Sequence, residues 1–175
     1  LSRGLGDVYK RQISNWDVSN VNNMYGMFYE AESFNQDISD WDVSSVTTTE
    51  KMFKFAEDFN QNLSSWDVSS VTSMAGMFDG ADNFNGNISA WNVSSVTGMS
   101  FMFAGATSFN QDISSWDVSN VPSMAGMFDN TDDLSDDNTC AIHSSFSSND
   151  DWPYDWEEYC PSEYFRPETR DELKI

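Results

Sequence analysis

One stretch of the chain, residues 84–109, reads FNGNISAWNVSSVTGMSFMFAGATSF and is one copy of a unit that occurs five times. Its tryptophan recurs at a step of 25 residues, at Trp16, Trp41, Trp66, Trp91 and Trp116. Self-similarity at a fixed period of this length indicates stacked supersecondary units, because each unit alone is too small to bury its apolar face. The sequence therefore predicts a repeat solenoid of about five 25-residue coils.

The spacing of apolar residues changes within the unit. Trp91 and Val93 are two residues apart, which predicts a short strand with one face inward. From Val96 to Ala106 the apolar residues are three and four apart, which is typical of the inner stripe of a short helix or helical turn. Gly105 lies near the expected end of that helix, where a left-handed residue is often needed. We therefore expect leucine-rich-repeat-like coils in which short parallel strands alternate with short helices.

Two rows of residues are expected to be structural. The tryptophan row, together with the nine methionines, should form an inward core stripe. An amide row follows the repeated phenylalanine, at Asn35, Asn60, Asn85 and Asn110. An amide at a fixed inward corner can donate to the coil above and accept from its own backbone, so we interpret this row as a structural ladder.

A third row follows each tryptophan and should point outward. It consists of Asp17, Asp42, Asp67, Asn92 and Asp117. These carboxylates are interpreted as solvated, or as hydrogen-bonded to the next coil's backbone or to nearby serine hydroxyls. The alternative is a ladder of calcium or other cations, for which the four aspartates are weak metal candidates. The glycine-rich nonapeptide of calcium-binding β-rolls is absent from the sequence, so no cofactor is expected and calcium remains the alternative.

The charge of the chain limits its partners. The formal net charge is −21, from 29 acidic and 8 basic residues, and no Lys or Arg lies between Phe55 and Phe165. Nucleic-acid affinity comes mainly from Lys and Arg, so nucleic acid is excluded as a partner. No stretch reaches the roughly 20 apolar residues that a membrane span needs.

The two ends differ from the repeats. Residues 1–12 match no part of the unit and are interpreted as a non-native or atypical leader, before a five-repeat solenoid over residues 13–137. A C-terminal cap is expected over 138–165 and a polar tail over 166–175. Cys140 and Cys160 lie in the expected cap, and we predict that they form a disulfide, which favours an extracellular protein.

The repeated pattern V-T-x-M-x-x-M-F-x-x-A-x-x-F-N-Q-D-I-S-x-W-D-V-S resembles the BspA-type surface-protein repeat, a leucine-rich-repeat relative also known from mycoplasma-type lipoproteins. The resemblance covers about residues 13–137. It implies a family that is found on cell surfaces and is linked to adhesion or protein binding, and it supplies no catalytic residues. One departure is Gly86, which stands where other copies have Gln and which we expect to be tolerated at an exposed corner.

These observations lead to a functional expectation. We expect a non-enzymatic, secreted or cell-surface module, monomeric, that binds an unidentified protein or glycan. The alternative is a structural or cation-binding acidic surface component. An enzyme is not expected, because no nucleophile, base and orienting group recur together and the carboxylates lie in rows. Outward positions such as Tyr29 and Lys54 differ from copy to copy, which fits either a recognition surface or solvated positions that packing does not constrain.

Overall fold

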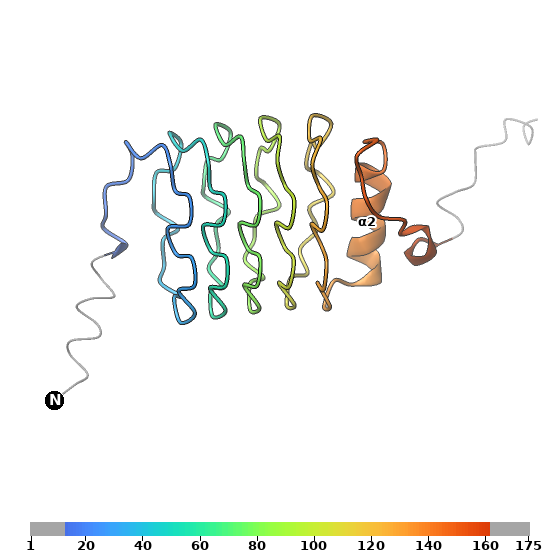
Figure 1. The fold of residues 1–175 in the computed structure, drawn as a ribbon, viewed down its shortest axis with the longest axis horizontal. Coiled ribbons are helices and arrows are strands. Elements are labelled where there is room, and N and C mark those ends of the chain that lie inside the picture. The colour runs from blue at the N-terminus through green and yellow to red at the C-terminus, as the bar shows by residue number, and fades with distance from the viewer. Residues whose placement is uncertain (1–12, 162–175) are drawn as a thin grey trace, which may run out of the picture.

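The computed structural model describes residues 13–161, in which five coils stand side by side in one row (Figure 1). Helix α2 (Asp136–Phe146) lies against the end of the row, and a short 3-10 helix, η1 (Glu157–Tyr159), follows it. No helix within this range is long and apolar enough to cross a membrane. The expected leader, the last four residues of the expected cap and the expected tail lie outside the described residues.

Backbone hydrogen bonds join each coil to the next. In the first coil, alternate N–H groups donate to carbonyls 24 residues further along: that of Met24 to Thr48 at 3.0 Å, and that of Phe28 to Met52 at 2.8 Å. The N–H groups between them close tight turns within the coil, as that of Met27 does on the Met24 carbonyl. The same alternation recurs in the second, third and fourth coils. Half of the donors in this segment therefore hold the coil in shape, and the other half hold the stack together.

The predicted helix is wrong for this segment, which forms consecutive turns instead. Two residues per coil, four apart, have positive φ, for example Phe101 at 58° and Gly105 at 68°. Each is the third residue of a hydrogen-bonded turn, where a type II turn requires the left-handed conformation. An α-helix tolerates neither this conformation nor N–H groups that bond outside the helix. Gly105 therefore has the backbone conformation expected of it, but in a turn.

The predicted strand at the Trp–Val pair is also absent from the described coils. Pairing is limited to isolated parallel bridges that link Asn23 to Thr48, Thr48 to Ser73, and Ser73 to Gly98. The segment from the tryptophan to the second valine turns instead, because the N–H of Val96 donates to the carbonyl of Val93 at 2.9 Å. A repeat solenoid is therefore shown, without the regular strands and helices of the expected leucine-rich-repeat coil.

Aromatic rings of successive coils stack directly over one another in the core. Phe53 lies 5.6 Å from Phe78 between ring centroids, and Phe78 lies 5.8 Å from Phe103, each pair at an angle of 5°. The tryptophan row is buried from the second coil onward, with side chains no more than 4% exposed. The indole N–H of Trp91 also donates to the carbonyl of Leu63 at 2.9 Å, 28 residues earlier. The indoles of the second to fifth coils therefore fill the core, and each donates to a backbone carbonyl.

The first coil departs from the expected inward stripe. Trp16 is 51% exposed and Met27 is 37% exposed, although the equivalent side chains of later coils are buried. Trp16 stacks on Trp41 at 6.2 Å on one side only, because no other coil precedes it within the described residues. The prediction of a buried stripe is therefore wrong for these two residues.

The amide row runs along the surface, and its side chains accept hydrogen bonds from the next coil. Asn85 Oδ1 accepts the backbone N–H of Asn110 at 3.0 Å and Nε2 of Gln111 at 2.7 Å. The same backbone bond joins the other members of the row, Asn35 to Asn60 and Asn60 to Asn85. This row was expected to lie at an inward corner and to donate to the coil above, and both expectations are wrong. The group that needs a partner at this turn is a backbone N–H of the next coil, so the asparagine side chain acts as an acceptor.

The cap continues this ladder and then ends it. Asn110 Oδ1 accepts the N–H of Ser135 at 3.1 Å and Nδ2 of Asn138 at 2.7 Å. Ser135 is also the N-cap of α2, where its hydroxyl accepts the N–H of Asn138. Ile142 and Phe146 on α2 are fully buried. The helix thus begins at the position where the ladder would have placed the amide of a sixth coil.

Three aromatic residues after α2 cover Phe128, the last ring of the phenylalanine stack. Trp152, Tyr154 and Trp156 lie 6.1, 6.1 and 5.4 Å from Phe128 between ring centroids. The Tyr154 hydroxyl accepts the N–H of Phe128 at 2.8 Å and donates to Asp129 at 3.0 Å. Burial is the first cause that raises the pKa of Tyr154 far above its usual value. The phenol therefore stays protonated and keeps both hydrogen bonds.

Cys140 on α2 and Cys160 after η1 form a disulfide with their Cα atoms 4.9 Å apart. It closes a segment with a sequence separation of 20 residues, which contains the three covering aromatic residues. We predict that Cys140→Ala/Cys160→Ala lowers the free energy of unfolding by about 3 kcal/mol, through the greater entropy of the open unfolded chain. Urea unfolding of both proteins checks this, with the reduced wild type as control. Equal midpoints for all three would contradict it.

Gly86 is buried rather than exposed at a corner, which corrects the expectation for this departure. A Cβ atom at Gly86 would lie 2.0 Å from the carbonyl oxygen of Gln61, far inside contact distance. We predict that Gly86→Gln, although it restores the repeat, lowers stability by about 1–3 kcal/mol through overpacking. The control is Gln111→Gly, which loses only the amide bonds to Asn85, worth about 1 kcal/mol. Thermal unfolding measures both, and an unchanged or raised midpoint for Gly86→Gln would show the prediction wrong.

Candidate functional site

The aspartate row lies on the surface and is hydrogen-bonded within its own coil. Asp42 Oδ1 accepts the backbone N–H of Ser44 at 3.1 Å and the Ser44 hydroxyl at 2.6 Å. Asn92 makes the same pair of bonds with Ser94, at 3.2 and 2.8 Å. The serine hydroxyl was one expected partner, whereas the next coil's backbone is not used. Each side chain closes an Asx-turn, which an amide closes as well as a carboxylate does.

These bonds stabilise the charged form of each carboxylate. The hydrogen bond from the serine hydroxyl two residues on is the first cause that lowers the pKa of the four aspartates below 3.8, and the serine N–H is the second. Neighbouring carboxylates act in the opposite direction, since Asp17 and Asp67 raise the pKa of Asp42 by a smaller amount. The row therefore stays charged, and local hydrogen bonds outweigh repulsion between coils.

A second row of this kind occupies another position of the repeat, and its role in the turn was not identified from the sequence. It consists of Asp37, Asn62, Asn87 and Asp112, and each accepts the backbone N–H of the serine two residues on at 2.9–3.0 Å. Its sequence signal is an Asp or Asn two residues before a serine in every copy, the same signal as in the aspartate row. Both rows are turn-forming devices that repeat because the turns repeat.

The aspartate row does not gather metal ligands. Within residues 13–161, the one group of three such side chains whose ligand atoms lie within 4.8 Å of one another is His143, Asp155 and Glu157. His143 Nδ1 accepts the indole N–H of Trp152 at 3.1 Å. An ion bound at Nδ1 would have to displace this hydrogen bond, because both use the same lone pair.

A different surface carries four exposed aromatic side chains. We call it the turn face, and it consists of residues 25–30, 50–55, 75–80, 100–105 and 125–130. Tyr25 is 55% exposed, Tyr29 44%, Phe55 39% and Phe101 50%. Large apolar side chains at this exposure, on one segment of successive coils, are typical of a surface that contacts another molecule. These positions include the variable outward residues of the sequence.

Glycines of the following coil make room for two of these rings. A Cβ at Gly80 would lie 2.4 Å from the ring of Phe55, and one at Gly126 would lie 2.4 Å from the ring of Phe101. Both glycines also have positive φ, at 67° and 65°. The two phenylalanine rings thus lie in space that any side chain at these glycine positions would fill.

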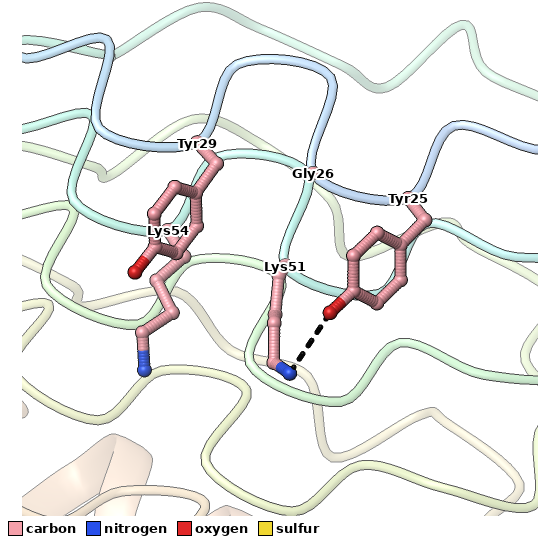
Figure 2. A pocket seen from close by; sticks show the side chains of 5 residues that line it. All are labelled: Tyr25, Gly26, Tyr29, Lys51 and Lys54. Carbon is pink, nitrogen blue, oxygen red and sulfur yellow. Dashed lines mark hydrogen bonds between the residues drawn. The ribbon is translucent and has the colours of Figure 1, made fainter.

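A pocket of about 450 Å³ lies at the N-terminal end of the turn face, lined by Tyr25, Gly26, Tyr29, Lys51 and Lys54. Figure 2 shows the two tyrosines on the first coil and the two lysines on the second, with Gly26 between the tyrosines. The phenol and ammonium groups project to the same side. The sequence indicated only Tyr29 and Lys54, because Tyr25 and Lys51 meet across the coils.

The two lysines have different partners. Lys51 Nζ donates to the Tyr25 hydroxyl at 3.1 Å and lies 3.5 Å from Glu50, whereas Lys54 Nζ pairs with Asp79. The bond to Tyr25 is the first cause that raises the pKa of Lys51. Interaction with Glu30 is the first cause that raises the pKa of Tyr29. At neutral pH the pocket therefore presents a protonated ammonium beside a protonated Tyr29 phenol. Its lining supplies hydrogen-bond donors and ring faces, which suit binding.

The lowered pKa values predict an acid-dependent loss of stability. Because the folded-state pKa of each aspartate lies below 3.8, the stabilisation is present above that pH and is lost as the pH falls through the lowered pKa. We predict that replacing Asp17, Asp42, Asp67 and Asp117 by Asn leaves the protein folded at neutral pH, as Asn92 indicates. The variant should lose less of its melting temperature between about pH 5 and about pH 2 than the wild type.

The matched control removes four other exposed carboxylates, by Asp→Asn at Asp40, Asp58, Asp82 and Asp132. Circular dichroism melts across the pH range compare the three proteins. If both quadruple variants flatten the pH dependence equally, net charge rather than the serine hydrogen bonds is the cause.

Comparison with known proteins identifies a family for this chain. A family model described as "Mycoplasma protein of unknown function, DUF285" matches residues 6–75 and 61–150. No curated protein and no solved structure matches the chain significantly. The two matched stretches overlap and together cover most of the chain, including all five coils. With its stacked repeats, the chain belongs to the DUF285 family.

Proposed function

We propose that this chain is a non-enzymatic binding module of an extracellular or cell-surface protein, and that its turn face contacts a protein or glycan. The observation that carries the proposal is the set of four exposed aromatic side chains on that face, Tyr25, Tyr29, Phe55 and Phe101. Aromatic side chains are enriched where proteins contact partners, because they provide a large contact area at low conformational cost. Because these four aromatic side chains are exposed to water on one face, we expect a binding partner to cover them.

The division between invariant and variable positions supports this proposal. Phe78 and its equivalents are the same in all five coils and are buried, whereas the position of Tyr29 is occupied by Lys54, Asp79, Ala104 and Asp129 in the later coils. The backbone of the face is held mostly by bonds between main-chain groups, which need no particular side chain. Side chains there are free to serve recognition without loss of the fold.

Cellular location is proposed on separate grounds. The Cys140–Cys160 disulfide is a feature of proteins in oxidising compartments, and the net charge of −21 is unsuited to nucleic acid. The repeat pattern also resembles BspA-type leucine-rich-repeat surface proteins, which are linked to adhesion. We therefore propose a secreted or surface-attached location, with the solenoid acting as a monomeric adhesion module.

A triple variant that borrows residues from sister coils tests the function. Tyr25→Ala, Tyr29→Asp and Phe101→Gly place on the face the residues that Ala75, Asp79 and Gly76 provide in the third coil, so the variant should fold. We expect the wild type to bind specific members of a glycan array or a panel of purified surface proteins, and the variant to lose at least about tenfold in affinity, as when aromatic anchors are removed.

The matched control is Tyr159→Ser, which removes an exposed aromatic side chain from the cap instead of the turn face. It should bind as the wild type does. Melting temperatures verify that all three proteins are folded. The proposal fails if no ligand binds the wild type, or if every ligand that binds it also binds the triple variant equally well.

A further inference from the structure

The pocket on the turn face contains all of the lysine and arginine side chains found within residues 13–161. These are Lys51 and Lys54, and they lie beside Tyr25 and Tyr29 in a chain of net charge −21. Equivalent positions in later coils hold Gly76 and other residues that are not basic. Cationic donors and exposed rings therefore coincide at one place in the described solenoid.

We propose that this pocket binds a sugar ring that carries one carboxylate, a hexuronic acid residue of a glycan. The inference rests on the proposed binding function of the turn face and specifies its ligand. It rests on four features of the pocket: the tyrosine rings, the lysine ammonium groups, the acidic residues around them, and backbone N–H groups that are already hydrogen-bonded.

The tyrosines provide the surface for the ring. Tyr25 and Tyr29 extend from one coil on either side of Gly26, where the backbone has φ of 59° and no side chain blocks the space between them (Figure 2). The volume of about 450 Å³ lies within the range of about 300–1,000 Å³ typical of small-molecule pockets. A phenol combines an apolar face with a polar tip, so it can pack against the C–H groups of a sugar and bond to its hydroxyls.

The lysines provide the site for the carboxylate. An ammonium group has three donors, and Lys51 uses its donors on Tyr25 and toward Glu50, whereas Lys54 is paired with Asp79. Both groups lie at the edge of an open pocket and retain donor capacity toward it. A carboxylate between them would gain charge-assisted hydrogen bonds, which are roughly twice as strong as neutral ones.

The surrounding charge limits the ligand to few negative groups. Glu50 and Asp79 balance the formal charge of the two lysines, Glu30 interacts with Tyr29, and acidic residues dominate the rest of the surface. Screening at physiological salt shortens electrostatic reach to about 8 Å, so a single carboxylate can enter while a densely charged polymer is repelled along its length. One carboxylate per ligand fits this balance better than a sulfated polymer.

An acidic peptide fits the pocket less well. Peptides commonly bind through backbone hydrogen bonds to free N–H groups. Here the N–H groups of Gly26, Tyr29, Lys51 and Lys54 all donate to backbone carbonyls, and that of Tyr25 donates to the side chain of Asn23. Recognition must therefore come from the side chains, which suits a ligand rich in hydroxyls with a single carboxylate.

Titration with methyl β-glucuronide, followed by NMR shifts of the pocket residues, tests the proposal directly. Methyl β-glucoside is the neutral control with the same ring. We expect the glucuronide to bind about tenfold more tightly than the glucoside, the ratio for one charge-assisted hydrogen bond. Added salt should weaken glucuronide binding and leave glucoside binding unchanged.

Two variants separate the contributions. Lys51→Gly/Lys54→Ala takes residues found at equivalent positions in the third and fourth coils, and should reduce the preference to less than about twofold. Tyr29→Ala should weaken both sugars, whereas Tyr159→Ser, on the cap, should weaken neither. Equal binding of the two sugars to the wild type, or no binding of either, would overturn the proposal. Binding of the acidic peptide acetyl-Asp-Glu-amide at this pocket in place of the glucuronide would also overturn it.

These results are distinguishable from failure of the turn-face function. If Lys51→Gly/Lys54→Ala retains every ligand that the Tyr25/Tyr29/Phe101 triple variant loses, the turn face binds its partner without a uronic acid. In that case only the inferred sugar is wrong. If the triple variant loses none of the ligands, the function proposed for the whole face fails as well.

Discussion

The stack depends on one constraint: alternate backbone N–H groups of each coil bond to carbonyls of the next. The donor of Phe28, for example, reaches Met52, while that of Met27 turns back on its own coil. Coils joined in this way lie about one strand spacing apart, near 4.8 Å. Every side chain is then placed over its equivalent, so the sequence must repeat with the structure. The stacked phenylalanine rings, such as Phe53 over Phe78 at 5.6 Å, are the direct consequence.

The same constraint would place like charges over one another, and the surface shows how the protein accommodates this. Each aspartate of the outward row is held in its charged form by a serine of its own coil, as Asp42 is by Ser44. The row therefore stabilises turns instead of binding the next coil. Asn92 makes the same contacts without charge, which shows that the hydrogen bond is the structural requirement at this position.

A stack of repeats exposes apolar side chains where the repeats stop. At the C-terminal end, a helix, aromatic side chains and a disulfide cover the last coil instead of another repeat. Ser135 occupies the position of the next asparagine in the amide row and is also the N-cap of α2. The last coil therefore ends, and the helix begins, at this residue. The aromatic residues that follow cover Phe128, and the disulfide of Cys140 holds them there. The exposed aromatic side chains of the turn face take no part in closing the stack and lie outside the core, which leaves them available for a ligand.

The sequence by itself determined the period, the inward set of residues from the second coil onward, and the outward position of most variable residues, although Ala104 among them is buried. It did so because burial acts on residue type, and residue type can be read directly. Only the tertiary structure decided where each backbone donor goes. Apolar spacings of three and four arise both in a helix and in consecutive turns, and the choice depends on whether an N–H such as that of Phe103 bonds within its segment or to the next coil. The pocket was decided in the same way, because Tyr25 and Lys51 are 26 residues apart and meet only when two coils stack in this register.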